Sequence, residues 1–402
     1  MILLNLFGLG ILYLINQVGS IVEIMKKVSV LAITVLVALF NTGCMKLEKS
    51  NISLYDKKDF EKVVDGKQVS LYTLKNSSGM ISQITNFGGK VVNLWVPDNK
   101  GQYADVVLGH DHIDEYLAST EKYLGAIIGR YGNRIGKGEF SLDSVKYTLA
   151  TNNGENHLHG GNKGYDAVVW EANHIDAQTL ELTYLSKDME EGYPGNLDIK
   201  VIYQLTDDNE LKVEYWATTD QRTIVNLTHH SYFNLHGEGV GKIGDHQLMI
   251  NADHYTPVDS GLIPTGALDE VAGTPMDFNE LTAIGERIDD DFEQLKIGLG
   301  YDHNWVLKQN ESGLNYAAKV VDPMSGRVME IMTNEPGVQF YSGNFMDGSL
   351  IGKGGKPYHH RSSVCLETQH FPDSPNKPDF PSTVLNPGEA YYSICVYKFS
   401  AE

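Results

Sequence analysis

Alternation of apolar and polar side chains is the sequence feature that most restricts the fold. A period of two is typical of β-strands with one buried face, and Gly, Asn, Asp or Pro bounds each alternating segment, as in an antiparallel meander. Spacing typical of helices is rare and predicts two short ones, at 111–117 and 281–287. We therefore predict an all-β domain of packed sheets with a ligand groove over residues 59–402. The alternating segments are 91–96, 105–108, 140–149, 179–185, 211–216 and 247–252.

The charge balance excludes some partners. The chain carries 52 Asp and Glu against 32 Lys and Arg, which gives a formal charge of −20. Binding of nucleic acid depends on clustered Lys and Arg side chains that neutralise phosphates, and the sequence has no such cluster. We therefore predict no nucleic-acid partner, and we find no basic cluster for a phosphorylated substrate.

The first 44 residues resemble an export signal. Lys26 and Lys27 precede an apolar run at 28–40, and small or polar residues at 41–43 lead into Cys44. A basic start, a short apolar run and a small residue before the cut are typical of signal peptides, and the run is too short to cross a bilayer. The ending is similar to a bacterial lipoprotein signal with Cys44 as the acylated residue, although an apolar residue is more usual at the position of Asn41.

These features predict three N-terminal parts. They are an upstream extension at 1–24 before a start at Met25, a lipoprotein signal peptide at 25–44, and a polar tether at 45–58. The alternative is that 1–24 and 28–40 are two genuine hydrophobic segments. We expect an exported bacterial envelope protein, anchored to the membrane only through its N-terminal lipid and facing the periplasm or the cell surface.

Three cysteines are too few for a disulfide framework. Cys365 and Cys395 lie in separate apolar, strand-like runs, so buried free thiols are the favoured interpretation. A disulfide between them remains open, because the sequence does not give their separation.

Polar residues gather in loops between the predicted strands. They are mainly Asn, Gln, Asp, Arg and His, the donors and acceptors that a neutral sugar needs, with Tyr232 and Trp305 as candidate aromatic faces for its C–H surfaces. A carboxylate with histidines can act as general base and general acid at a hemiacetal. Spacing alone supports such a polyol site but does not choose the reaction. The segments are 129–138, 156–161, 226–235, 300–305, 339–344 and 365–369.

Other interpretations of these segments are weaker. The glycine-rich segment 129–138 lacks the Gly-Lys-Ser/Thr of a phosphate-binding loop and has no βαβ context. A zinc site could combine several histidines with Asp302, but no cysteine ligand or His-Glu-x-x-His helix supports it, and we predict no metal and no cofactor. We expect His157 and His229 to be structural. Glu367 stands in an apolar strand, where a carboxylate is costly unless it is paired or used.

In this order the segments resemble the galactose mutarotase (aldose 1-epimerase) family. The resemblance covers nearly all of residues 60–400 and includes less catalytic stretches, at 105–109, 191–195, 256–259, 262–266 and 386–389. It implies a large antiparallel β-sandwich with few short helices and a sugar site in a central groove. It also implies an isomerase that interconverts the α and β anomers of free hexoses such as galactose and glucose. We expect it to act as a monomer.

The resemblance also implies roles for individual residues. Glu367 matches the catalytic base, His230 the catalytic acid and His159 the second active-site histidine. We expect Glu367 to stay charged and His230 to hold a proton near neutral pH, because a carboxylate favours the imidazolium. Two positions depart from the family pattern: His229 stands where Asn is common, and Trp305 where Phe or Tyr is usual. The implied sugar-binding residues are Asn133, Arg134, His159, Ser231, Tyr232, Asp302 and Gln339.

Three alternative functions remain open at this stage. An epimerase of hexose 6-phosphates would need further cationic groups. A non-catalytic envelope sugar-binding module would not need both Glu367 and His230. A glycoside hydrolase usually needs two carboxylates that flank the bond, and Asp302 is the one partner that the sequence suggests for Glu367.

Overall fold

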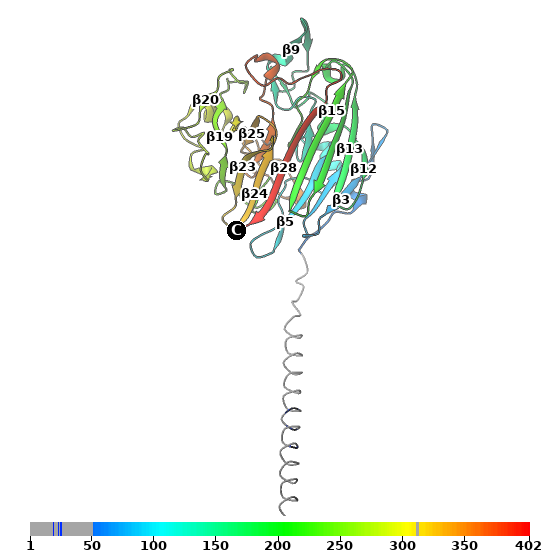
Figure 1. Ribbon diagram of the computed structural model, residues 1–402, viewed down its shortest axis with the longest axis vertical. Coiled ribbons are helices and arrows are strands. Elements are labelled where there is room, and N and C mark those ends of the chain that lie inside the picture. Colours follow the sequence, from blue (N-terminus) through cyan, green and yellow to red (C-terminus); the bar gives the residue numbers. More distant parts are fainter. Residues whose placement is uncertain (1–18, 20–22, 24, 26–50, 311–312) are drawn as a thin grey trace, which may run out of the picture. The chain divides into compact units, whose positions relative to one another are not determined.

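The largest layer of the fold is a nine-stranded antiparallel sheet (Figure 1). The computed structural model describes residues 19, 23, 25, 51–310 and 313–402, and Asn51–Glu402 form one compact unit. In spatial order the strands are β12 (Glu171–His174), β13 (Thr179–Ser186), β14 (Leu197–Leu205), β15 (Glu210–Thr219), β28 (Tyr391–Ala401), β24 (Arg327–Thr333), β23 (Asn315–Val321), β18 (Gln247–Ile250) and β21 (Thr282–Ala283).

Alternation places one face of this sheet in the core. In β14 every second side chain from Leu197 to Leu205 is buried, while the residues between them are exposed or half-buried. Val201 of β14 pairs with Tyr215 of β15, so buried side chains line up across the ladder. A one-residue slip would move each of them to the solvent face, and the pattern therefore fixes the register.

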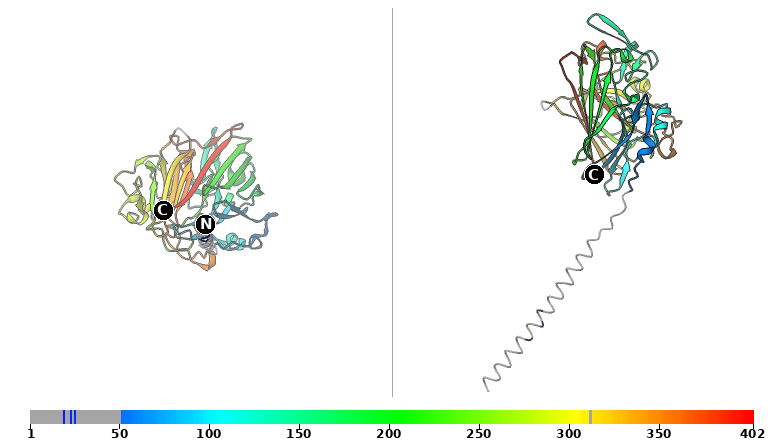
Figure 2. Two further views of the ribbon diagram at one scale, coloured as in Figure 1. Left: turned by 60° about the horizontal axis from the view of Figure 1, so that its bottom comes forward. Right: turned by 90° about the vertical axis from the view of Figure 1, so that its right-hand side faces the viewer.

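Two smaller sheets complete the sandwich. Strand β3 packs against β13 and β14, and β5 packs against β28, so the four-stranded sheet covers the large one (Figure 2). The strands of the five-stranded sheet contribute Trp305, Phe340 and Leu366 to the same core. The four-stranded sheet contains β3 (Leu71–Lys75), β4 (Ile81–Thr85), β5 (Lys90–Pro97) and β6 (Tyr103–Asp105), and the five-stranded sheet contains β20 (Asp269–Glu270), β19 (Ala252–Thr256), β22 (Asp302–Leu307), β25 (Gly337–Tyr341) and β26 (Cys365–Gln369).

The other described strands form short antiparallel pairs. Over residues 51–310 and 313–402 the α-helices are α2 (Ile113–Ala118) and α3 (Glu293–Gly298), and no described helix has the length and apolarity needed to cross a membrane. The pairs are β1 (Lys62–Val64) with β2 (Lys67–Val69), β7 (Ala126–Ile128) with β17 (Thr228–His230), β8 (Arg134–Ile135) with β11 (His157–Leu158), β9 (Glu139–Leu142) with β10 (Val145–Thr148), and β16 (Thr223–Ile224) with β27 (Val384–Leu385).

The predicted all-β sandwich with few short helices is confirmed, with local corrections. The segment 140–149 is a hairpin of β9 and β10, and only the first residue of 105–108 belongs to a strand, β6. The predicted helix at 111–117 is present as α2. The helix at 281–287 is wrong: its first residues pair with β18 as β21, and Gly285 packs tightly on Gly244 in the 3₁₀ turn Ile284–Glu286.

The domain begins earlier than predicted. The predicted tether at 45–58 includes residues 51–58, but Asn51 exchanges hydrogen bonds with the backbone of Tyr103. The Tyr55 backbone amide donates to Gln83, and its hydroxyl donates to Asp111 at 2.7 Å. These contacts order the segment, so the predicted tether is at most 45–50. The extension, the signal peptide and Cys44 lie outside the described residues, apart from positions 19, 23 and 25.

Cys365 of β26 and Cys395 of β28 are both buried free thiols, as favoured from the sequence. Burial raises the pKa of both thiols. They are therefore protonated, unreactive core residues at neutral pH.

Arg327 joins the large sheet to the four-stranded sheet. Its guanidinium is 3% exposed and donates to three backbone oxygens, of Val96, Leu235 and Gln102, at 2.9–3.0 Å. Val96 lies in β5 and Arg327 begins β24. One buried cation therefore donates to carbonyls from three separate segments.

Replacing Arg327 with Met should lower the free energy of unfolding by about 3 kcal/mol or more, because buried carbonyls lose charged donors. Urea unfolding measures this change. Arg327→Lys, which keeps the charge but not the planar fork, should lose less than the Met variant. Equal stability of all three proteins would contradict the proposed role of this arginine.

Candidate active site

A cavity of about 200 Å³ lies where the five-stranded sheet meets the short strand pairs. Its wall is polar and aromatic, and its volume is below the range usual for drug-sized ligands, so it suits a small polar molecule. It is lined by Glu121, Tyr123, Asn133, Arg134, Asn153, Leu158, His159, His230, Tyr232, Asp302, Tyr341, Phe345 and Glu367.

Three neighbouring strands supply the acidic side of the cavity. In the ladder of β22, β25 and β26, Gln339 lies opposite Glu367 and Asp302 lies opposite Tyr341. Gln339 donates from Nε2 to Asp302 Oδ1 at 2.7 Å, and Arg134 Nη2 lies 3.6 Å from Asp302 Oδ2. Asp302 is therefore held from both sides. Gln339 does not line the cavity and acts through Asp302.

His159 is fixed as a hydrogen-bond donor. It follows β11 directly and, like Asn133, has a positive φ, near 50° and 62° respectively. The Asn133 amide donates to His159 Nδ1 at 3.1 Å, and the His159 amide donates to the Asn133 carbonyl at 3.0 Å. Since Nδ1 accepts a hydrogen bond, the neutral ring carries its proton on Nε2. Burial lowers the pKa of His159 well below its usual value, so the ring stays neutral.

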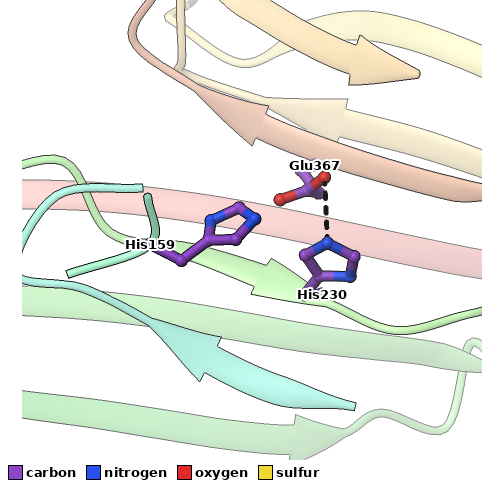
Figure 3. Close-up of side chains that lie close together, drawn as sticks. All are labelled: His159, His230 and Glu367. Carbon is purple, nitrogen blue, oxygen red and sulfur yellow. Dashed lines mark ion pairs between the residues drawn. The ribbon is translucent and has the colours of Figure 1, made fainter. Parts of the chain in front are cut away.

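His230 and Glu367 face each other inside the cavity. His230 Nε2 lies 3.5 Å from Glu367 Oε1, with the two side chains 5% and 2% exposed (Figure 3). The His230 ring stacks on Tyr232, with centroids 4.8 Å apart, and on Tyr123 at 5.8 Å. Within the described part of the chain, Glu367 Oε2 has no hydrogen-bond partner although it is buried. That oxygen is placed to accept a proton from a ligand.

Burial changes the expected charges of this pair. Burial raises the pKa of Glu367 well above its usual value. The charge of Asp302 also raises this pKa, and the charge of Arg134 lowers it. Burial lowers the pKa of His230 to about 3. The expected charged carboxylate beside an imidazolium is therefore not the favoured state: removal of both groups from water favours one proton, held by the carboxyl group, with a neutral imidazole.

Two further predicted contacts are corrected by the structure. Ser231 does not line the cavity; its hydroxyl pairs with His229 Nε2 at 2.6 Å, on the face opposite to His230. Trp305 is fully buried in the core, and its indole donates to Met276 O at 3.0 Å. It stands three residues after Asp302 in β22 and so points to the other face.

His157 and His229 are structural, as expected. His157 bonds the Ala150 carbonyl at 2.7 Å and the Tyr193 hydroxyl at 2.6 Å. His229 lies between Ser231 and the Tyr203 hydroxyl. Burial lowers the pKa of His157 to about 4 and that of His229 to about 3, so both are neutral at pH 7.

Sequence reasoning missed five residues that line the cavity with a polar or aromatic side chain. Tyr341 had a usable signal, because it stands two residues after Gln339, near the centre of a recognised segment. No comparable sequence pattern indicates Asn153. Its side-chain oxygen accepts a hydrogen bond from Arg134 Nε at 3.2 Å. The five are Glu121, Tyr123, Asn153, Tyr341 and Phe345.

His159, His230 and Glu367 lie close enough together to be considered as metal ligands. The donor set fits a metal poorly, however. His159 Nδ1 already accepts the Asn133 amide, so Nε2 carries a proton and cannot offer a lone pair. The arrangement instead provides one donor, one acid–base imidazole and one carboxyl group for proton transfer.

Comparisons with known proteins agree with this geometry. The family model described as aldose 1-epimerase matches residues 70–398. Galactose mutarotase of Bos taurus is 46% identical over 317 residues, which cover 79% of this chain and 90% of that protein. Aldose 1-epimerase of Escherichia coli K12 is 39% identical over 341 residues, 84% of this chain and 97% of that protein. A solved aldose epimerase homologue from C. elegans superposes with a TM-score of 0.77 at 30% identity, covering 83% of this chain and 99% of that one.

Replacing Ser231 with Ala should destabilise the fold without weakening sugar binding. The variant leaves buried His229 Nε2 without its partner, which costs about 1–3 kcal/mol in the free energy of unfolding. Chemical denaturation and a titration with galactose measure the two effects separately. A loss of sugar affinity in a variant of unchanged stability would restore Ser231 to the site.

Proposed function

Since this chain belongs to the aldose 1-epimerase family, it is an isomerase that interconverts the α and β anomers of free hexoses, and we propose that Glu367, His230 and His159 carry out its proton chemistry. The observation that carries this assignment is the buried 3.5 Å contact between His230 and Glu367 in the small polar cavity. The two residues are 137 positions apart in the sequence, so only the fold could bring them together.

The reaction needs one base and one acid that exchange roles. Glu367 takes the proton of the C1 hydroxyl while His230 gives its proton to the ring oxygen, and the C1–O5 bond opens. Rotation about C1–C2 presents the other face of the aldehyde. On closure Glu367 returns its proton to O1 and His230 takes one from the C5 hydroxyl. Protons and electrons balance, and each transfer by a placed group contributes about 10²–10⁴-fold in rate.

This cycle explains the protonation of the pair. Before opening the pair is a carboxylate and an imidazolium, and after opening it is a carboxylic acid and a neutral imidazole. Burial favours the second state. Hydrogen bonds from the sugar favour the carboxylate, and the stacked rings of Tyr123 and Tyr232 favour the imidazolium, so both act towards the first state. The pair keeps one proton throughout.

The other cavity residues bind and orient the sugar in this proposal. His159 donates from Nε2 to a sugar oxygen, because its tautomer is fixed by Asn133. Arg134 and Asp302, already held by each other and by Gln339, offer a donor and an acceptor to hydroxyl groups. Ordering these side chains before binding reduces the entropy that binding must supply.

The cavity favours an unphosphorylated sugar. Of the described residues that line it, Arg134 is the one Arg or Lys, and it already lies near Asp302 and donates to Asn153. A sugar phosphate would instead need cationic donors that are free to bind it.

The N-terminal sequence supports export as a further part of the proposal. Lys26 and Lys27, the apolar run at 28–40 and the small residues before Cys44 fit a lipoprotein signal. The compact unit begins at Asn51, so residues 45–50 would separate the lipid from the enzyme. The protein would then act on free sugars in the bacterial envelope.

Replacing Glu367 with Gln should reduce kcat by about 10²–10⁴-fold, because the amide cannot accept the C1 proton. Polarimetry with fresh α-D-galactose and α-D-glucose measures the rate above that of buffer. Sugar affinity should change far less, since the amide keeps the shape and one acceptor. Mutarotation at the rate of the unmodified enzyme would reject Glu367 as the base.

Replacing Cys44 with Ser should prevent acylation and release the protein from membranes. Expression of both forms in bacteria fed radiolabelled palmitate, followed by membrane fractionation, measures labelling and location. Cys365→Ser is the matched control, because that thiol is buried and should not affect labelling. An unlabelled parent protein, or equal labelling of the Cys44 variant, would contradict lipid attachment at this residue.

A further inference from the structure

A second, larger groove adjoins the catalytic cavity. The groove has a volume of about 870 Å³, against about 200 Å³ for the cavity, and the two share Asn153 and Phe345 in their walls. Ligand sites usually measure roughly 300–1,000 Å³, so the groove is large enough for a ligand of its own. Anomer exchange of a free hexose needs only the cavity and leaves the groove without a role.

The shared residues place the groove beside the part of the cavity that is proposed to bind sugar hydroxyl groups. Asn153 Oδ1 accepts a hydrogen bond from Arg134 Nε at 3.2 Å. The Phe345 ring stacks on Tyr341, with centroids 5.7 Å apart, and Tyr341 lies opposite Asp302 in the ladder of β22 and β25. A group attached to one of those hydroxyl positions would therefore extend from the cavity into the groove.

Phe345 provides an aromatic surface at this junction. Its side chain is 55% exposed, although a large apolar ring is usually buried. The ring is held in place, because its backbone amide donates to the Tyr341 hydroxyl at 2.9 Å and the two rings stack. A fixed, exposed aromatic ring can pack against the C–H face of a sugar. Phe345 can thus contact a sugar in the cavity and the next sugar in the groove.

Buried polar side chains hold the loops around the groove together. Asn156 accepts from the Lys137 amide at 2.9 Å and donates to the Gly261 carbonyl at 3.0 Å, and it is 8% exposed. Asp373, 2% exposed, accepts from the Gly136 amide at 2.9 Å. Segments far apart in the sequence are therefore joined before a ligand arrives, which reduces the entropy that binding must supply.

The side chains that line the groove favour a neutral polar ligand. Lys137 and Asn376 are exposed and offer a donor and an acceptor to hydroxyl groups, and half-buried Leu262 and Ile297 offer apolar surface. Two lysines stand against four carboxylates, and this excess of negative charge disfavours phosphate or uronate groups. The charged residues of the groove are Lys137, Lys377, Glu139, Glu155, Asp259 and Asp373.

We propose that this groove binds the further units of a neutral reducing oligosaccharide, three or more sugars long, while its terminal aldose exchanges anomers in the cavity. The proposal rests on the proposed function, because it takes Glu367 and His230 as the reacting groups. The groove makes and breaks no bond and does not take part in the proton transfers. Its contacts are the same before and during ring opening, so they should lower KM and leave kcat unchanged.

The test compares glucose with maltotriose and cellotriose, whose α and β linkages direct the second sugar differently. NMR exchange spectroscopy of the anomeric protons measures α–β exchange at equilibrium over a range of sugar concentrations. KM for at least one trisaccharide should be roughly fivefold to tenfold below KM for glucose, which is the effect of one or two net contacts. Values of KM for both trisaccharides that equal or exceed that for glucose would overturn the proposal.

Ser260→Trp and Glu155→Trp test the groove directly, because each places a bulky ring in it from a different loop. Neither residue lines the catalytic cavity, so KM for glucose should stay the same while KM for the preferred trisaccharide rises to that for glucose. Thr218→Trp is the matched control, at an exposed position of β15 outside the groove, and should keep the trisaccharide preference.

The outcomes separate the groove from the catalytic assignment. A trisaccharide preference that survives in both groove variants, or that is lost equally in Thr218→Trp, would overturn the role of the groove. Absence of glucose and galactose exchange by the unmodified protein would instead reject the proposed function. Exchange of both hexoses without a trisaccharide preference rejects the groove alone.

Discussion

Burial of a carboxyl group and an imidazole side by side governs this molecule. Away from water neither Glu367 nor His230 is stable as an isolated ion, so the two share a proton and their protonation states are coupled. Catalysis of anomer exchange needs such a pair, because each group must be an acid in one half of the reaction and a base in the other. Because the pair has little contact with water, a charge on either group is costly. For the same reason, a hydrogen bond from a sugar hydroxyl strongly affects which of the two groups holds the proton.

The sheets hold Glu367 and His230 next to each other and away from water. Glu367 lies in the middle of β26, where backbone pairing with β25 fixes it opposite Gln339. His230 ends β17, which pairs with β7 rather than with the same sheet. The two catalytic side chains thus come from strands that belong to different ladders but pack against each other. This packing sets their 3.5 Å separation, so stability of the core and geometry of the site are linked.

Some polar groups around Glu367 and His230 bind the sugar in the proposed function, and others fix those binding groups in place. Gln339 holds Asp302, and Asn133 holds His159 in one tautomer. Such supporting contacts fix donor and acceptor directions before the sugar arrives, which limits the reorganisation needed during reaction. The same logic accounts for His157 and His229, whose neighbours in the sequence line the cavity while their own rings bond to buried hydroxyl groups.

The sequence by itself determined the fold class and the chemical inventory. Period-two alternation survives in β13, β14 and β15 because one face of each strand is buried, and the ordered polar segments contain the acid, the histidines and the sugar-binding types. The sequence could not determine which neighbouring side chains point into the cavity, or how far the cavity excludes water. Ser231 and Trp305 are predicted at the site, but Ser231 pairs with His229 and Trp305 is buried in the core. Glu121 belongs to no recognised motif, but the fold places it in the cavity wall. The protonation of Glu367 and His230 likewise depends on burial, which arises from segments distant in the chain and leaves no local mark in the sequence.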